Sequence, residues 1–286
     1  MAIRRFAIPD LTSRLSRYGK DQPVFPSLFV SHGTPMIALS TPEEDLYVAA
    51  LHELGQALPK PKAVVVVSAH LATGDDAISV NSSHQLLAFH DFGGFPGKLY
   101  MERYDCPGDP ALAAEIVGAL ASAGMNAAIE KSPTIDHGVW VPLKHLFPKA
   151  DVPVVQVSLP YPDRPQMTLK LGKVLGAFRQ KGVLLLGSGG AVHNLQDLKW
   201  HEKSAKGQAR AQEFEDWLLE KLKKKDVESL MNYEEEAPHA AWAHPTAEHL
   251  FPLFFTVGSA LEGDEVHTLT QGIEYGSLSM FSFLMS

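Results

Sequence analysis

Residues Ser27–Met36 read SLFVSHGTPM, and this stretch joins a run typical of a buried β-strand to a histidine, His32, at the point where that strand must end. A glycine and a proline follow within three residues, and both residue types interrupt strands. The same order recurs in KAVVVVSAH, Lys62–His70, and in VLLLGSGGAVHN, Val183–Asn194. Strands of this kind decide the fold class, and the histidines that follow them are the first candidates for a functional site.

Apolar, β-branched runs alternate along the chain with segments of helical period. Continuous apolar strands that alternate with helices predict a single α/β domain, with a largely parallel central sheet flanked by helices on both faces. The expected strands are Ser27–His32, Lys62–His70, Ala77–Ser83, Val152–Leu159 and Val183–Gly189, followed by a strand, a turn and a strand at the C-terminus. The expected helices are Pro42–Leu58 with Thr41 as N-cap, Pro107–Gly124 with Asp109 as cap, Arg164–Gly182, a long helical region from about Ser204 to Asn232, and Thr246–Leu261, which is kinked or begins again at Pro252.

We expect residues 1–22 to be an N-terminal extension and residues 23–286 to form the domain. The start carries arginines but no apolar segment of the kind found in secretory signals. The longest apolar run, which begins at Leu250, is shorter than the roughly 20 residues of a membrane-spanning helix. A single cysteine, Cys106, excludes an intrachain disulfide and fits a reducing compartment. These features predict a soluble, cytoplasmic protein.

The charge balance limits the class of partner. The 286-residue chain has a formal net charge of −8 and a pI of about 5.9. Nucleic acids and anionic membranes attract clustered Lys and Arg, so neither is an expected partner. The densest basic run, around Lys223–Lys225, lies among glutamates in a helical stretch and is typical of a solvent-exposed helix face.

Histidines follow several of the expected strands. Ligands of open α/β sheets bind outside the carboxyl ends of the strands, which is where His32 and His70 lie, and His193 comes a few residues after a third strand. One histidine at a strand end is more often a hydrogen-bonded core residue, but three at equivalent ends favour a metal or acid–base site at that rim. Three more histidines belong to segments that could reach the same rim: His137 in the loop DHGVW, His244, and His249 in the first turn of the helix expected from Thr246.

Other chemistries lack their motifs in this sequence. GSGGAV resembles the start of a dinucleotide-binding loop, but Val192 occupies the position of the third glycine. Ser188 lies in GSGG rather than in GxSxG, so a Ser–His hydrolase is open but unsupported. The chain contains no GxxxxGK[ST] loop and neither a CxxC nor an HExxH zinc signature.

Seven blocks of sequence point to a known family. They are SHGTPM (Ser31–Met36), SAH (Ser68–His70), FHDFGGFPGKLYMERYDCPGDPALA (Phe89–Ala113), DHGVWVPLKHLFP (Asp136–Pro148), VPVVQVSL (Val152–Leu159), GSGGAVHNL (Gly187–Leu195) and HPTAEHLFPLFFTVGSA (His244–Ala260). In this order they resemble the DODA-type extradiol aromatic ring-opening dioxygenases, which are class III, LigB-like enzymes. The resemblance extends from about Val24 to the C-terminus.

The resemblance implies a mononuclear non-haem Fe(II) site that inserts both atoms of O₂ into a catechol, such as a DOPA-like substrate. It implies His32 and His70 as metal ligands and a third ligand from HPTAEH. His249 is preferred for that position, while His244 and Glu248 are open alternatives, because the best-known branch of the family uses a glutamate.

Two further histidines receive roles through the resemblance. His193 would lie beside the metal, as an additional ligand or as the acid–base residue. His137 would line the substrate pocket and either assist His193 or donate a hydrogen bond to bound oxygen. A shell made only of histidines also suits Zn²⁺, which can occupy such a site in purified protein without supporting the redox reaction. The alternatives are therefore a metal-binding protein on the same scaffold without oxygenase activity, and a zinc-dependent hydrolase.

Overall fold

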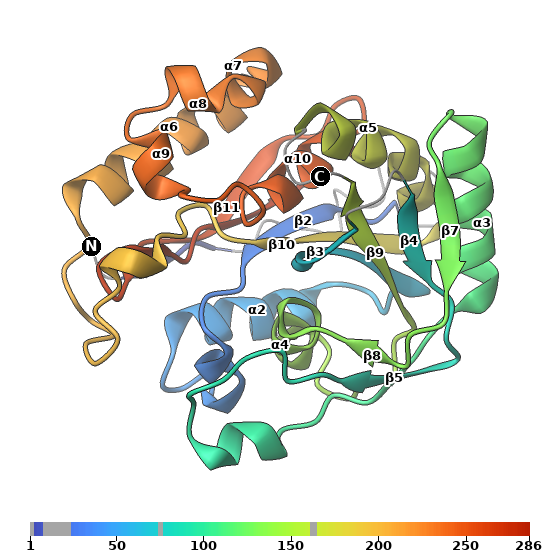
Figure 1. Cartoon of the computed structure of the whole chain (residues 1–286), viewed down its shortest axis with the longest axis horizontal. Coiled ribbons are helices and arrows are strands. Elements are labelled where there is room, and N and C mark those ends of the chain that lie inside the picture. Colours follow the sequence, from blue (N-terminus) through green and yellow to red (C-terminus); the bar gives the residue numbers. More distant parts are fainter. Residues whose placement is uncertain (1–2, 8–23, 74–76, 161–164) are drawn as a thin grey trace.

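The computed structural model describes residues 3–7, 24–73, 77–160 and 165–286, and a nine-stranded sheet forms the centre of this part of the chain (Figure 1). The strand order is β1-β11-β14-β2-β10-β3-β9-β4-β7. In order along the chain, these strands are β1 (Arg4–Arg5), β2 (Ser27–Ser31), β3 (Ala63–Thr73), β4 (Ile78–Asn81), β7 (Ala127–Glu130), β9 (Val154–Pro160), β10 (Val183–Gly189), β11 (Val266–Gln271) and β14 (Ser282–Met285).

The four central strands β2, β10, β3 and β9 are parallel, which confirms the predicted sheet for its centre. Both flanks also contain antiparallel pairs, because β14 pairs with β2, β11 with β14, and β4 with β9. The edge strand β1 comes from the expected N-terminal extension and pairs with β11. In the centre, Ser188 of β10 lies opposite Val30 of β2 and Ser68 of β3, so the three strands reach the same level.

Helices cover both faces of the sheet, as predicted. Figure 1 shows α2 (Leu46–Ala57) and α4 (His137–Leu146) on one side and α5 (Pro165–Leu175) and α10 (Phe251–Gly258) on the other. Successive valines of β3 belong to two different cores, one on each face. A strand buried on both faces has no polar alternation, which explains the unbroken apolar runs in the sequence.

Shorter elements complete the described chain. Small sheets are formed by β12 with β13 and by β6, β5 and β8. The remaining elements are η2 (Pro35–Leu39), β5 (Gln85–Ala88), η3 (Gly97–Met101), β6 (Cys106–Pro107), α3 (Pro110–Ser122), β8 (Thr134–Ile135), η4 (Gly176–Lys181), η5 (Leu195–Asp197), α6 (Ala209–Lys224), α7 (Val227–Met231), α8 (Tyr233–Glu236), α9 (Ala240–Ala243), β12 (Ile273–Glu274) and β13 (Leu278–Ser279).

The segment DHGVWVP forms the start of helix α4 and is not the loop that the sequence predicts. Pro142 lies inside this helix, where it has no N–H to donate to the carbonyl of Gly138. The helix forms nonetheless because nearly every residue in it is buried, including Val139 and Trp140, so tertiary packing outweighs the local cost of the proline.

Three predicted helix boundaries were also wrong. Helix α2 begins at Leu46 because Asp45, rather than Thr41, accepts hydrogen bonds from the first free backbone N–H groups. The C-terminal helix begins at Phe251, so His249 precedes it rather than lying in its first turn. The long helical region is divided between α6 and α7 by Lys225, which adopts a left-handed conformation with φ 55°.

The remaining helix predictions fared better. Asp109 caps α3 as expected, by accepting a hydrogen bond from the N–H of Leu112. The predicted start at Arg164 lies outside the described residues. The helix described there, α5, ends at Leu175 and is followed by η4, which ends at Lys181 with the left-handed Gly182 as its C-cap. No helix in the described ranges combines the length and the apolar character needed to cross a bilayer.

A buried ion pair joins the ends of several elements at the edge of the sheet opposite the histidines. The side chains of Arg179 and Asp264 are 1% and 0% exposed and form a two-pronged contact. The guanidinium also donates to three carbonyls, those of Phe25 at 2.7 Å, Ser259 at 2.9 Å and Met285 at 3.2 Å. All five N–H groups of the arginine are therefore satisfied, which is the condition under which a buried cation is tolerated.

Replacing Arg179 with Met leaves the Asp264 carboxylate buried without its guanidinium partner, and we expect the free energy of unfolding to fall by about 3–5 kcal/mol. Urea denaturation followed by circular dichroism measures this change. Lys181→Met is the matched control, because Lys181 belongs to the same 3₁₀ helix but pairs with Glu115 on the surface. Such a pair contributes less than about 1 kcal/mol. Equal losses of stability in the two variants would contradict this account.

Candidate metal centre

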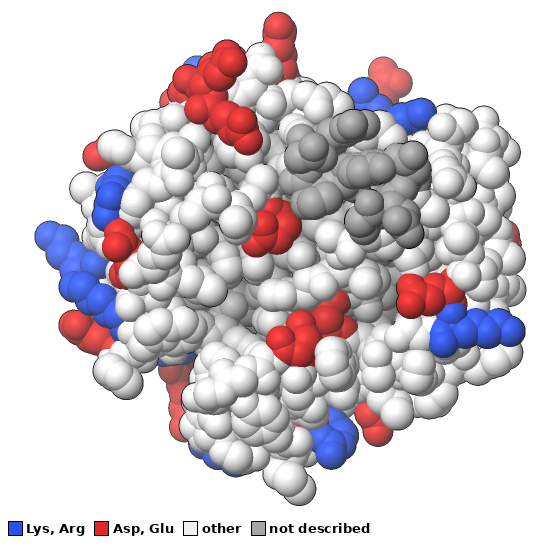
Figure 2. All heavy atoms as spheres, in the orientation of Figure 1, with Lys and Arg blue, Asp and Glu red and all other residues white. Residues whose placement is uncertain are grey.

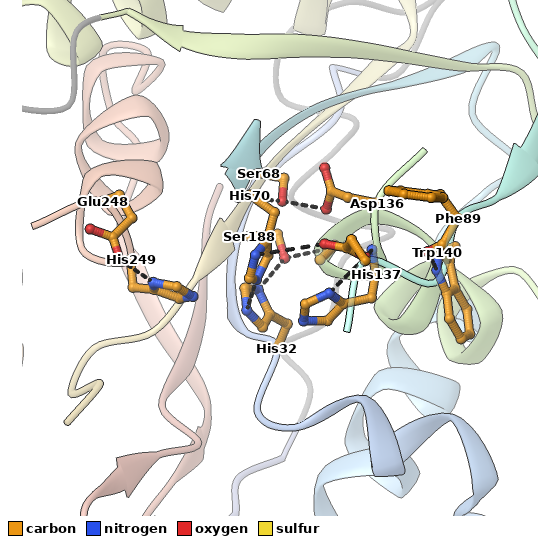
Figure 3. Close-up of polar contacts among 12 residues, drawn as sticks. His32, Ser68, His70, Phe89, Asp136, His137, Trp140, Ser188, Glu248 and His249 are labelled. Carbon is orange, nitrogen blue, oxygen red and sulfur yellow. Dashed lines mark hydrogen bonds and ion pairs between the residues drawn. The ribbon is translucent and has the colours of Figure 1, made fainter. Parts of the chain in front are cut away.

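Three histidines from distant parts of the sequence converge at the carboxyl ends of the central strands (Figure 3). His32 directly follows β2, His70 lies within β3, and His249 lies two residues before α10. The Nε2 atoms of His32 and His70 are 3.1 Å apart, and the nitrogens offered by the three rings lie within 4.8 Å of one another. This arrangement is a candidate metal centre.

Glycines on β10 allow the chain around His249 to approach this closely. The N–H of Gly190 donates to the carbonyl of His249 at 2.7 Å. A Cβ atom on Gly189 would lie 2.1 Å from that same carbonyl oxygen, and one on Gly187 would lie 2.2 Å from the carbonyl oxygen of Pro252. Gly187 and Gly189 of GSGG are therefore explained by close backbone packing, and a role in binding phosphate is not needed for them.

His70 lies in an irregular part of β3. This strand does not end at His70, as the sequence predicts, but continues to Thr73, and its register with β9 shifts between Val67 and Ala72. An irregularity of this kind changes the direction of a side chain relative to the regular pleat. Its effect here is consistent with the ring of His70 lying against that of His32, with the ring centroids 4.9 Å apart.

The hydrogen bond between His249 and Glu248 shows which nitrogen of His249 is available. Nδ1 lies 2.9 Å from Oε1 of Glu248, and an ionised carboxylate can only accept, so Nδ1 carries the proton. Nε2 then has a free lone pair. It is buried and has no hydrogen-bond partner among the described residues. A buried acceptor without a partner is costly, and a metal ion at the cluster would remove that cost.

The imidazole rings of His32, His70 and His249 are neutral at neutral pH. Burial, followed by the neighbouring histidines, lowers the pKa of His32 and of His249 well below the ordinary value. Burial also lowers the pKa of His70 to about 4. The rings are therefore unprotonated at neutral pH, which is the form that binds metal. Three neutral imidazole donors fit a first-row transition metal ion.

His193 lies directly beside this group. Its ring stacks on that of His249 with the centroids 3.4 Å apart and an angle of 6° between the planes. Its backbone N–H donates to the carbonyl of Ala243 at 2.9 Å, and the residue forms an isolated β-bridge with Leu278. Burial lowers the pKa of His193 to about 3, with His244 as the second cause.

His137 approaches from the first turn of α4. Its ring centroid lies 4.0 Å from that of His70 and 5.4 Å from that of His32. The carboxylate of Asp91 accepts from both the backbone N–H and Nδ1 of His137, each at 2.9 Å. Burial acts to raise the pKa of Asp91, but the hydrogen bonds from His137 outweigh it and hold that pKa below its usual value.

Asp91 is the residue that sequence reasoning missed. Its second oxygen lies 3.7 Å from Nδ1 of His70, so one carboxylate faces two histidines of the site. The available signal was its position beside His90 in the block FHDFGG, where an acidic residue interrupts a run of aromatic residues and glycines.

His244 lies apart from the cluster. Its Nε2 lies 2.9 Å from the carbonyl of Ala191, and its ring packs against Phe214 with the centroids 5.4 Å apart. Within the described residues it belongs to none of the groups whose donor atoms could share a metal ion. Of the candidates in HPTAEH, His249 therefore faces the cluster, and Glu248 holds its proton.

The surroundings of the centre are polar on one side and aromatic on another. A cavity of about 210 Å³ adjoins His70 and is lined by Asp91, Asp136, Gln156 and Phe89, among other residues. Phe92 places its ring edge-on to His137 at 5.5 Å and contacts Tyr100 and Trp140. Figure 2 shows a hollow in this view of the surface with acidic side chains beside it, while Lys and Arg lie toward the outline.

The sequence of this chain matches known proteins over nearly its whole length. The model of the family described as catalytic LigB subunit of aromatic ring-opening dioxygenase matches residues 26–283. A 4,5-DOPA dioxygenase extradiol of Escherichia coli K12 is 37% identical over 262 residues, which cover 90% of this chain and 93% of that protein. A protein of the same name from Beta vulgaris is 33% identical over 268 residues, covering 93% of this chain and 98% of that protein.

The fold is also found among solved structures. The crystal structure of an uncharacterized protein from Escherichia coli K12 is similar with a TM-score of 0.76 and 32% sequence identity, covering 92% of this chain and 100% of that chain. The α/β fold and the enzyme class expected from the sequence, an extradiol ring-opening dioxygenase, are thereby confirmed. This chain belongs to the family of catalytic LigB subunits of aromatic ring-opening dioxygenases.

Proposed function

We propose that this protein uses a metal ion held by His32, His70 and His249 to open the ring of a DOPA-like catechol with O₂. The observation that carries the proposal is the convergence of three neutral imidazoles, of which His32 and His249 are buried and His249 presents an Nε2 atom without a partner among the described residues. Relatives named 4,5-DOPA dioxygenase extradiol support the choice of substrate and of the 4,5 bond.

Fe(II) is the proposed metal for activity, because the reaction is oxidative and Zn²⁺ is redox-inert. His32, His70 and His249 would hold the ion, which would bind the catechol and O₂ and lower the cost of deprotonating the catechol. Zn²⁺ fits the same donors and would act as an inactive occupant.

The protein residues around the metal would position the substrate and move its protons. Asp91 holds the proton of His137 on Nδ1, which leaves Nε2 of that ring as a proton acceptor. His193 stacks on His249, and its neutral ring has a nitrogen lone pair that would accept a proton from a catechol hydroxyl and later return it. The cavity beside His70 offers space for the substituent of the catechol ring.

Oxygen uptake tests the reaction directly. Protein loaded anaerobically with Fe(II) should consume one O₂ per DOPA and produce a yellow semialdehyde, and Zn²⁺-loaded protein should do neither. An oxygen electrode and absorbance spectra on a panel of catechols measure both. Stoichiometric metal without uptake on any catechol would refute the oxygenase proposal, and activity with Zn²⁺ in the absence of O₂ would indicate a hydrolase.

Metal content of purified variants tests the ligand set. His32→Ala, His70→Ala and His249→Ala should each lose most of the bound metal, whereas His193→Ala should keep more metal than activity. Elemental analysis alongside turnover separates these two effects. Equal metal loss in His193→Ala would make His193 a ligand rather than the acid–base residue.

Glu248→Gln distinguishes an orienting residue from a ligand. The glutamine carbonyl can still accept from Nδ1 of His249, so we expect metal affinity to fall by no more than about tenfold. Glu248→Ala removes the acceptor and is the matched comparison, with a larger loss expected. Competition with a chelator measures the metal affinity of both variants. An equal loss of affinity in Glu248→Gln and Glu248→Ala would contradict the orienting role of Glu248.

The metal-free protein should be sensitive to acid. The pKa of His70 is about 4 in the folded state and about 6.5 when the chain is unfolded, so below pH 6.5 the unfolded state binds more protons. Stability should therefore fall progressively as the pH is lowered from about 6.5 toward 4. Thermal unfolding at several pH values measures this. Added Zn²⁺ should raise the midpoint at pH 7, and an unchanged midpoint would argue against a preformed site.

A further inference from the structure

We propose that Ser188 is a positioning residue for the metal centre, which holds His32 in the tautomer that presents Nε2 to the metal. This proposal rests on the proposed metal site, and the hydrogen bonds that support it lie within the protein.

Pro142 leaves one carbonyl of α4 without its helical donor. In a regular α-helix the N–H of each residue donates to the carbonyl four residues earlier, so residue 142 would donate to Gly138. Proline has no N–H, and the carbonyl of Gly138 is therefore free to accept from elsewhere. Because this carbonyl lies one residue after His137, its partner also anchors the turn that carries that histidine.

Ser188 supplies the missing donor. Its Oγ lies 2.5 Å from the carbonyl oxygen of Gly138, and the serine is fully buried. A hydroxyl has one proton, so after donating to Gly138 it can only accept. The atom that lies 3.0 Å away on its other side is Nδ1 of His32.

The tautomer of His32 follows from this chain of donors. Nδ1 must carry the proton that Ser188 accepts. A neutral imidazole has a single N–H, so Nε2 then carries the lone pair. This Nε2 atom lies 3.1 Å from Nε2 of His70, so its lone pair belongs to the candidate metal centre.

Removing the hydroxyl would favour a competing arrangement. Without Ser188 as acceptor, the proton of His32 can move to Nε2 and form a direct hydrogen bond with Nε2 of His70. That bond would occupy the lone pairs of two metal ligands at once. Metal binding would then have to break this hydrogen bond and return the proton of His32 to Nδ1. In the absence of Ser188 that proton would have no acceptor in a buried environment.

The register of the sheet places Ser188 where its hydroxyl can contact both His32 and Gly138. Strand β10 lies between β2 and β3, and Ser188 is opposite Val30, two residues before His32. Ser68 is at the same level on β3, but its hydroxyl donates to Asp136 at 2.7 Å and accepts from the backbone N–H of His70. Of these two serines, Ser188 is therefore the one that joins His32 to the turn of His137.

Ser188→Ala tests the proposal, with Ser27→Ala as the matched control. Ser27 is also a buried serine of the central sheet whose hydroxyl donates to a carbonyl, that of Thr256 at 3.3 Å, but it lies at the opposite end of β2. We expect Ser188→Ala to bind Zn²⁺ about 10–100-fold more weakly in a chelator competition, and Ser27→Ala to bind it as the unsubstituted protein does.

The ring nitrogens give a readout that a loss of packing would not produce. In ¹⁵N spectra of the metal-free, unsubstituted protein, His32 should show a protonated Nδ1 and an unprotonated Nε2. Ser188→Ala should shift His32 toward protonated Nε2, while Ser27→Ala should not.

Two results would overturn the proposal. One is a protonated Nε2 on His32 in the unsubstituted protein, which can be observed whether or not Ser188→Ala folds. The other is equal Zn²⁺ affinity in Ser188→Ala and Ser27→Ala. Neither readout uses a catechol or O₂, so the proposed reaction can fail while this proposal stands, and the reverse.

Discussion

The site depends on the parallel pairing of β10 with β2 on one side and β3 on the other, in a register that brings the three strands to one level. This pairing places His32 and His70 side by side, although β2 and β3 are separated by β10 and do not pair with each other. It also requires the glycines of β10, because the chain carrying His249 packs directly on that strand. One buried strand therefore organises ligands from three separate parts of the sequence.

Serines near the carboxyl ends of these strands connect the strands to the loops of the site. The hydroxyl of Ser31 accepts from the N–H of Ala191, two residues before His193. That of Ser68 donates to Asp136, one residue before His137. That of Ser188 contacts His32 and Gly138. Small hydroxyl side chains can bond to backbone groups while fitting inside a packed sheet, which explains why they precede histidines in this sequence.

The inner part of the metal centre is formed by neutral imidazoles, and the outer part contains carboxylates. Burial keeps His32 and His249 neutral, so their rings act as donors rather than as cations. Carboxylates lie instead on the outer side: Glu248 accepts from Nδ1 of His249, and Asp91 accepts from Nδ1 of His137. This distribution favours a cation at the centre and also fixes the orientation of the rings, as outer carboxylates do in other metal sites.

The sequence by itself determined the α/β class, the central strands and the histidines that follow them, because continuous apolar runs and their interruptions are local features. Only the tertiary structure showed that α4 is a helix despite Pro142, that His249 precedes α10, and that Asp91 faces two histidines. It also decided which nitrogen of His32 is free. That choice depends on a donor far away in the sequence, and hydrogen bonds between distant residues leave no periodic pattern to read.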